Sequence, residues 1–458
     1  MSPTTTTKAA PKHLLADVDR MLRYLIFAYI ALLVLEGALR KWFLPSLSGV
    51  LLLARDPIVF AAYGLALANK RFPVNVYVIS GLALMFVCVL TTLLVGHGNL
   101  AVTIFGFRAN FLHIPFAFLM GSVLNRDHVI EIGRWWLWGT LIMTVLIVLQ
   151  FATPQSSWFN RGVGGDTDGA GFSGAMGRFR PPGTFSFIIG VVWFYVTSTA
   201  FLVSGMMQHK KYSKLLLALS AMAVFIAIPV SISRQLMLAA ALTFLVGIFS
   251  STFQKDFLMR YLRIGLIGIV GLLIADQIPI FDDAKETFLA RWERSTGEDK
   301  GGVEGALISR IIIDFTAPFT ETTDVPFFGQ GLGAGTQVGA QLLTGERGFE
   351  LGEGEWFRLI GEAGFLLGTL FILWRFWVTV RLAQFAIIAF VRGNGMGLIM
   401  LSTAAYNIMI GQLGQTTING FTIVGIGLTI ASMRIPKKVS PTMNRPLEHA
   451  SDIDKKPA

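Results

Sequence analysis

The chain has 458 residues, of which 53% are hydrophobic and 14% are charged, and its formal net charge is +10. Soluble domains usually carry about a quarter of their residues as charged side chains, so this composition excludes a series of soluble domains. It indicates a single integral membrane domain. Cys88 is the only cysteine, which excludes a disulfide framework and any zinc or iron–sulfur centre held by cysteines.

Long apolar segments predict an all-α polytopic membrane protein with about 12 transmembrane helices. The predicted spans begin near Leu22, Leu47, Val74, Val102, Trp135, Phe185, Leu215, Ser233, Leu262, Leu359, Met396 and Ile418. The second, fourth and eighth of these contain charged residues. The first span is followed by further spans and lacks a small-residue cleavage site, so we interpret it as a retained anchor.

Basic residues gather at alternate ends of the predicted spans. They include Lys70, Arg71, Lys210, Lys211, Arg375, Arg381 and Arg392. By the positive-inside rule these ends are cytoplasmic, and so are both termini. The net charge therefore reflects membrane topology and does not indicate nucleic-acid binding. The expected layout is a cytoplasmic tail over residues 1–21, a membrane domain over 22–436 and a disordered tail over 437–458.

Two long loops then lie on the outer side, over residues 153–184 and 281–356. The second loop, at roughly 75 residues, is much longer than an ordinary connection, and such loops are usually functional or disordered. Its apolar periodicity favours a functional, helical loop. One helix is predicted to lie on the membrane surface through Phe281, Phe288, Leu289 and Trp292, and a second to contain Arg310. The glycine-rich stretch 326–337 predicts a turn.

Arginines occupy outer positions in and around these loops, although acids outnumber bases about two to one in the larger loop. The four candidates are Arg178, Arg180, Arg234 and Arg310. The planar guanidinium fork binds phosphate oxygens in pairs and stays charged, which favours a local anion site. Alternatively, each arginine reaches the membrane interface with its head group or pairs with a nearby acid.

Arg55 and Asp56 fall inside the second predicted span. Ionisable residues at that depth are rare and are functional candidates by default. The adjacent pair can also neutralise itself or support a neighbouring helix. We therefore treat Arg55 and Asp56 as supporting residues.

The stretch GEGEWFRLIGEAGFLLG, residues 352–368, places several charges where the large loop meets the tenth span. A helix that begins near Gly354 brings Glu355, Arg358 and Glu362 onto one face. Helix capping with one ion pair explains this pattern. The functional alternative is that a carboxylate acts as a general base whose geometry Arg358 fixes.

Four motifs in order resemble the O-antigen polymerase and ligase superfamily of bacterial envelopes. They are RPPGTFS, SISRQLMLA, SRIIIDFTAPFTETTDVPFFGQGLGAGTQ and EGEWFRLIGEAGFLLG. The resemblance covers roughly residues 178–374, around the large predicted loop. It implies metal-independent glycosyl transfer at the periplasmic face of the bacterial inner membrane, without a cofactor. The implied substrate is a glycan on undecaprenyl pyrophosphate, and the implied partner is a chain-length regulator.

The resemblance also implies roles for individual residues. The arginines named above, Arg178, Arg180, Arg234 and Arg310, are the expected pyrophosphate ligands. The family's E-x-G element corresponds to Glu362 and Gly364. The ligase branch opens its last motif with a His-Asn pair, and this chain has Glu353-Gly354 there. The difference favours a polysaccharide polymerase, with Glu353 or Glu355 in place of the histidine as base.

Three other functions are compatible with a polytopic chain. The first is O-antigen ligase-type transfer to a lipid or protein acceptor. The second is a lipid-linked oligosaccharide flippase, for which internal repeats and charges spread over many spans would be expected. The third is a membrane acyltransferase, for which His97 and His113 are the candidate histidines.

Overall fold

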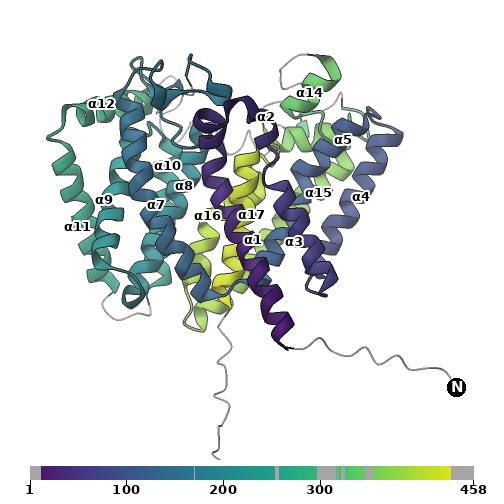
Figure 1. The fold of residues 1–458 in the computed structure, drawn as a ribbon, viewed down its shortest axis with the longest axis horizontal. Helices are drawn as coiled ribbons and strands as arrows, with labels where there is room; N and C mark the ends of the chain where they lie inside the picture. Colours follow the sequence, from purple (N-terminus) through teal and green to yellow (C-terminus); the bar gives the residue numbers. More distant parts are fainter. Residues whose placement is uncertain are drawn as a thin grey trace, which may run out of the picture.

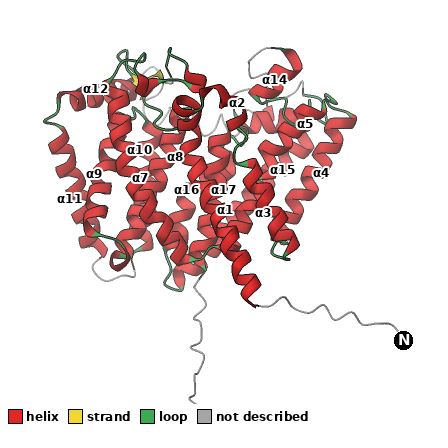
Figure 2. Cartoon of the chain, in the orientation of Figure 1, coloured by secondary structure: helices red, strands yellow, loops and turns green. Residues whose placement is uncertain are grey.

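The computed structural model describes residues 12–169, 171–252, 257–296, 316, 318–320, 325–345 and 354–434. Helices dominate these residues, and their only sheet is one short antiparallel pair of strands (Figure 2). In that pair Phe172 lies opposite Arg180, and Ser173 lies opposite Phe179.

The first part of the chain forms long helices joined by short helical turns. Its elements are α1 (Lys12–Ala38), η1 (Leu39–Phe43), η2 (Pro45–Leu47), α2 (Ser48–Leu51), α3 (Asp56–Ala68), α4 (Val76–Leu94), α5 (Leu100–Phe107), η3 (Arg108–Leu112), α6 (Ile114–Val123), α7 (Arg126–Ala152), η4 (Trp158–Asn160) and η5 (Val163–Gly165). Two of these elements, η1 and η3, are π-helical segments. Such segments are rare and occur frequently at functional sites.

The second part begins with the strand pair and continues as helices. Its elements are β1 (Phe172–Ser173), β2 (Phe179–Arg180), α8 (Ile188–Met207), η6 (His209–Lys211), α9 (Lys214–Val230), α10 (Arg234–Ser250), α11 (Phe257–Ala275), α12 (Pro279–Thr296), α14 (Gln337–Thr344), α15 (Glu355–Val391), α16 (Met396–Ile410) and α17 (Thr416–Met433).

Among the described residues, 8 helices are long and apolar enough to cross a membrane. A bent pair, Tyr261–Ala275 with Pro279–Arg294, would make 9. Three further apolar helices are shorter than a full span: Lys214–Val230, Arg234–Ser250 and Met396–Ile410. The all-α, multi-pass character is therefore confirmed, and the number of 12 spans stays a prediction.

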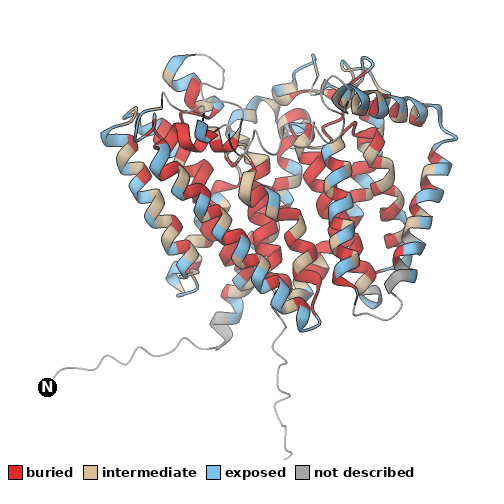
Figure 3. Cartoon of the chain, turned by 180° about the vertical axis from the view of Figure 1, so that it is seen from behind, coloured by how far each residue is buried: buried red, intermediate tan, exposed pale blue. Residues whose placement is uncertain are grey.

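The peripheral helices present large apolar side chains outward. Trp135 and Ile142 on α7 are 73% and 72% exposed, and Leu273 on α11 is 60% exposed. A soluble protein rarely exposes apolar surface on this scale, so these faces fit contact with lipid. By contrast, almost every residue of α8 is buried, and the buried residues concentrate toward the middle of the bundle (Figure 3).

The bundle has two groups of helices that α16 and α17 join (Figure 1). One group contains α7 to α12, with α9 packed on α7 and α11. The other contains α1 to α6 with α14 and α15, and α15 packs on α4. Helix α16 contacts α8, α10 and α15, while α17 contacts α6, α7 and α8. The two central helices thus carry contacts from both groups.

The start of α1 and the end of α17 lie at one end of the bundle, which we call the termini end (Figure 1). Helices α12 and α14 lie at the opposite end, the loop end (Figure 1). Helix α12 confirms that a helix contains Phe281 and Trp292, and its predicted position on the membrane surface stays a prediction. The predicted turn at 326–337 is also confirmed and leads into α14. The second predicted loop helix, around Arg310, lies outside the described residues.

Candidate functional site

Helix α15 is sharply bent near its beginning. Gly364 adopts φ 77° and ψ 170°, far from helical values. In a straight helix, residues twenty positions apart are separated by about 30 Å. Instead, Nη1 of Arg375 lies 2.7 Å from Oε1 of Glu355. Residues 355–363, which we call the half-helix, must therefore fold back alongside the rest of α15.

This geometry corrects the predicted position of the charged cluster. The sequence placed Glu355, Arg358 and Glu362 at the outer mouth of a straight span. They are instead 3%, 6% and 1% exposed, inside the protein. The predicted shared face is confirmed, because Arg358 contacts both carboxylates. Glu353, the fourth predicted member of this group, lies outside the described residues.

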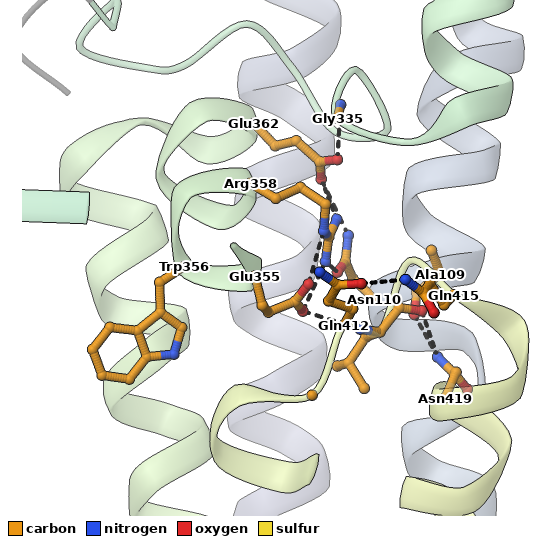
Figure 4. Close-up of polar contacts among 12 residues, drawn as sticks. Ala109, Asn110, Gly335, Glu355, Trp356, Arg358, Glu362, Gln412, Gln415 and Asn419 are labelled. Carbon is orange, nitrogen blue, oxygen red and sulfur yellow. Dashed lines mark hydrogen bonds and ion pairs between the residues drawn. The ribbon is translucent and has the colours of Figure 1, made fainter. Parts of the chain in front are cut away.

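Arg358 lies at the centre of the cluster (Figure 4). Its Nε and Nη2 donate to the two oxygens of Glu355, over 3.0 and 2.9 Å. Its Nη1 donates to Oε2 of Glu362 over 2.9 Å. Its Nη2 also donates to Oδ1 of Asn110, on the π-helical segment η3, over 2.7 Å. The side chain thus ties the half-helix to η3.

Arg375 is the second cation of the cluster. The sequence analysis placed it at the end of a span, and this position is wrong because Arg375 lies within α15, well before its last residue Val391, and is only 1% exposed. Besides Glu355, it donates to the carbonyls of Ile408, Asn407 and Gly411, over 2.6, 3.0 and 2.7 Å. These carbonyls lie at the end of α16, where helical carbonyls begin to lack N–H partners, although that of Asn407 also accepts the N–H of Gly411. Arg375 therefore caps α16 and neutralises Glu355.

The glycine-rich turn docks directly on the half-helix. The N–H of Gly335 donates to Oε1 of Glu362 over 3.1 Å (Figure 4). The N–H groups of Gln330 and Gly331 donate to the carbonyls of Gly361 and Glu362. A side chain on Gly364 would clash with the carbonyl of Phe327. Glycine is therefore needed at the bend both for its positive φ and for the close approach of the turn.

These contacts determine what the carboxylates do. Both Glu355 and Glu362 accept charge-assisted hydrogen bonds from Arg358, and each accepts a backbone N–H as well, from Leu413 and Gly335 respectively. The arrangement is a satisfied, buried ionic network. Their use in proton transfer stays a prediction.

Arg55 and Asp56 belong to a second buried network on α1, α3 and η3. Oδ2 of Asp56 pairs with Arg108, and its Oδ1 lies 3.1 Å from Nε2 of His113. Arg55 pairs with Glu36 over 3.2 Å and donates to the carbonyl of Thr416 over 2.6 Å. The predicted support of neighbouring helices is thus visible in the contacts.

A small pocket separates the two networks. Its volume is only about 10 Å³, and it lies between Arg55, Arg108, His113 and Asn419. Asn419 donates to the carbonyl of Ala109, next to Asn110 (Figure 4). The segment η3 therefore serves both networks, through Arg108 on one side and Asn110 on the other.

Sequence reasoning missed several members of these networks, notably Asn110, Arg108 and Arg375. Arg108 and Asn110 lie in the fourth predicted span, for which the sequence analysis noted charged residues without assigning them a role. Polar residues so deep in an apolar segment were the available signal. Glu36, the partner of Arg55, also pairs with Arg40, at 3.5 Å.

A separate group of arginines lies at the loop end, which we call the rim arginines: Arg180, Arg234 and Arg291. Burial and the nearby charges of Arg291 and Arg234 lower the pKa of Arg180 to about 10. Nε of Arg180 is buried and has no hydrogen-bond partner among the described residues. Nη1 of Arg291 donates to the carbonyls of Ser173 and Gly174, over 3.3 and 3.1 Å.

The predicted phosphate-binding residues are thus only partly brought together. Arg180 and Arg234 interact with each other, and Arg291, which the sequence analysis did not select, joins them. Arg178 instead pairs with Asp283 on α12. Arg310 lies outside the described residues. Like charges that crowd together favour the binding of an anion.

Comparison with known proteins found no family model, curated protein or solved structure that matches this chain. Within the described part of the chain, no group of three or more His, Cys, Asp or Glu side chains is placed to hold a metal ion.

Proposed function

We propose that this chain is a membrane glycosyltransferase of the polysaccharide polymerase type. It joins oligosaccharide repeat units, carried on undecaprenyl pyrophosphate, in O-antigen or exopolysaccharide biosynthesis. In this proposal the chain spans the bacterial inner membrane about 12 times, with the loop end in the periplasm and both termini in the cytoplasm. A chain-length regulator is the expected partner.

The observation that carries the proposal is the group of rim arginines. Three guanidinium groups interact at the loop end, and one of them, Arg180, has a buried N–H without a described partner. A pyrophosphate supplies several negative oxygens to such a group, and guanidinium forks match their geometry. The order of the four sequence motifs points to the same substrate class.

The proposed reaction transfers a glycan from its pyrophosphate carrier to a hydroxyl group. An acceptor hydroxyl attacks the anomeric carbon of the donor glycan, and the bond from that carbon to the pyrophosphate oxygen breaks. The rim arginines stabilise the negative charge that develops on the leaving pyrophosphate. The hydroxyl proton passes to a carboxylate. Because Glu355 and Glu362 are held by Arg358, we assign them to positioning and leave Glu353 as the first candidate base.

The test compares Arg180→Ala with Arg178→Ala, its neighbour that pairs with Asp283. Each variant is expressed in a host strain that lacks the gene, and its lipid-linked and surface glycans are sized on a gel. The proposal expects single repeat units for Arg180→Ala and chains near wild-type length for Arg178→Ala. Full-length polymer retained on its lipid carrier in the deletion strain would instead indicate a ligase.

One observation favours the flippase alternative. Broken membrane helices whose half-helices are buried at membrane depth are typical of transporters, and the half-helix 355–363 with its ionic network has this character. A flippase predicts that the deletion strain accumulates lipid-linked units on the cytoplasmic side. Protection of these units from a glycosidase added to spheroplasts would support that function and contradict the polymerase.

A further inference from the structure

A large groove opens at the termini end of the bundle, between α4, α6, α15 and α17. Its volume is about 460 Å³, and it is open to the surroundings. Its walls are mostly apolar and include Tyr77, Phe118, Leu382, Phe385 and Ile430. The groove is separate from both buried networks and from the rim arginines.

The depth of the groove matches one leaflet of a bilayer. Along α15 it extends from Arg392, just past the helix end, back to Leu382. Ten helical residues cover about 15 Å. Half of the hydrocarbon core of a bilayer is also about 15 Å thick. A lipid acyl chain therefore has the length and the polarity to fill this groove.

The mouth of the groove is basic. Arg392 is exposed and Arg434 follows the end of α17, and both line the groove. Nη1 of Arg434 donates to the carbonyls of Gly121 and Leu124 at the end of α6, each over 3.1 Å, which holds the guanidinium at the mouth. Among the described residues neither arginine forms an ion pair with a carboxylate. Basic residues beside an apolar crevice between helices recognise anionic lipid head groups.

We propose that this groove binds one anionic phospholipid of the surrounding leaflet, with an acyl chain against Leu382 and Phe385 and its phosphate between Arg392 and Arg434. The lipid then contacts α15 and α17. Helix α15 carries the ionic cluster around Arg358, and α17 borders the pocket through Asn419. This inference does not depend on the proposed glycosyl transfer.

The test measures lipid binding to the full-length protein in a neutral detergent, by native mass spectrometry. Phosphatidylglycerol and phosphatidylcholine with the same acyl chains are added in competition. A basic residue near the head group contributes about fivefold in affinity, so two arginines predict a preference of roughly 25-fold for the anionic lipid. Equal binding of the two lipids, or binding of neither, would overturn the proposal.

Three variants sharpen the test. Arg392→Gln removes one charge, leaves the bonds of Arg434 to α6 intact and is expected to reduce the preference about fivefold. Ala389→Trp fills the groove without a change of charge and is expected to abolish binding of both lipids. Arg263→Ala, on α11 outside the groove, should match the wild type. An unchanged preference in Arg392→Gln, or unchanged binding in Ala389→Trp, would contradict the assignment.

Discussion

Arginine has opposite surroundings in the cluster around Arg358 and in the group of rim arginines. Arg358 and Arg375 are buried, and each pairs with carboxylates over distances of 2.7 to 2.9 Å. In the rim group, burial and the charges of its neighbours lower the pKa of Arg180, and its Nε has no described partner.

The contrast distinguishes arginines that hold the fold from arginines that can hold a ligand. A buried charge without compensation is costly, so a paired cluster is disrupted when one partner is removed. A cation surrounded by other cations already costs stability, and a bound anion relieves that cost. The two regions should therefore respond oppositely to the loss of an arginine.

The largest expected effect is that of Arg375→Ala. This change leaves Glu355 with one cation fewer and removes the donors that cap α16, and loss of one partner of a buried pair costs about 3–5 kcal/mol. Thermal unfolding in detergent should show a large drop in stability. The control is Arg381→Ala on the same helix, whose partners are the neutral side chains of Tyr77 and Gln384. Equal stability of the two variants would contradict the stabilising role of the buried ion pair.

Gly364→Ala should have the next largest effect. Its φ of 77° disfavours any side chain, which costs about 1–3 kcal/mol at a strained position, and the new methyl would meet the carbonyl of Phe327. The matched control is Gly64→Ala in α3, where a methyl meets nothing within 4 Å. That control should be neutral or up to about 1 kcal/mol more stable. A stable, fully active Gly364→Ala protein would argue against the bend.

A smaller effect is expected from pH at the rim. The pKa of Arg180 is lowered to about 10, so the unfolded chain binds more protons above this pH, and stability should rise there as pH increases. Anion binding has the opposite sign, because it needs the protonated guanidinium. Stabilisation by added pyrophosphate should persist at neutral pH and decrease as pH rises through about 10. If the stabilisation by pyrophosphate already decreases near neutral pH, a titrating group other than Arg180 controls the binding.

The sequence predicted the local features of these regions and missed the long-range ones. Hydrophobic runs predicted a multi-pass helical fold, and helical spacing predicted that Arg358 would share a face with Glu355 and Glu362. The reversal at Gly364 could not be predicted, because helix periodicity continues through the bend and the glycine alone does not specify its φ. Arg375 was consequently assigned to the end of a span.

The same limit applies at the rim. Arg180 and Arg234 were selected because each stands near the outer end of a predicted span. Arg291 lies on α12, more than a hundred positions after Arg180 in the sequence. Arg291 joins the other two arginines because α12 packs near the strand pair. This packing is visible in the hydrogen bonds from Arg291 to the carbonyls of Ser173 and Gly174.

The most direct test of the contrast is the thermal unfolding of Arg180→Ala and wild-type protein, each with and without pyrophosphate. Our account predicts that Arg180→Ala unfolds at or above the wild-type temperature and that pyrophosphate stabilises only the wild type. A variant that is strongly destabilised, as expected for Arg375→Ala, would contradict it. So would a variant that pyrophosphate stabilises as much as the wild type.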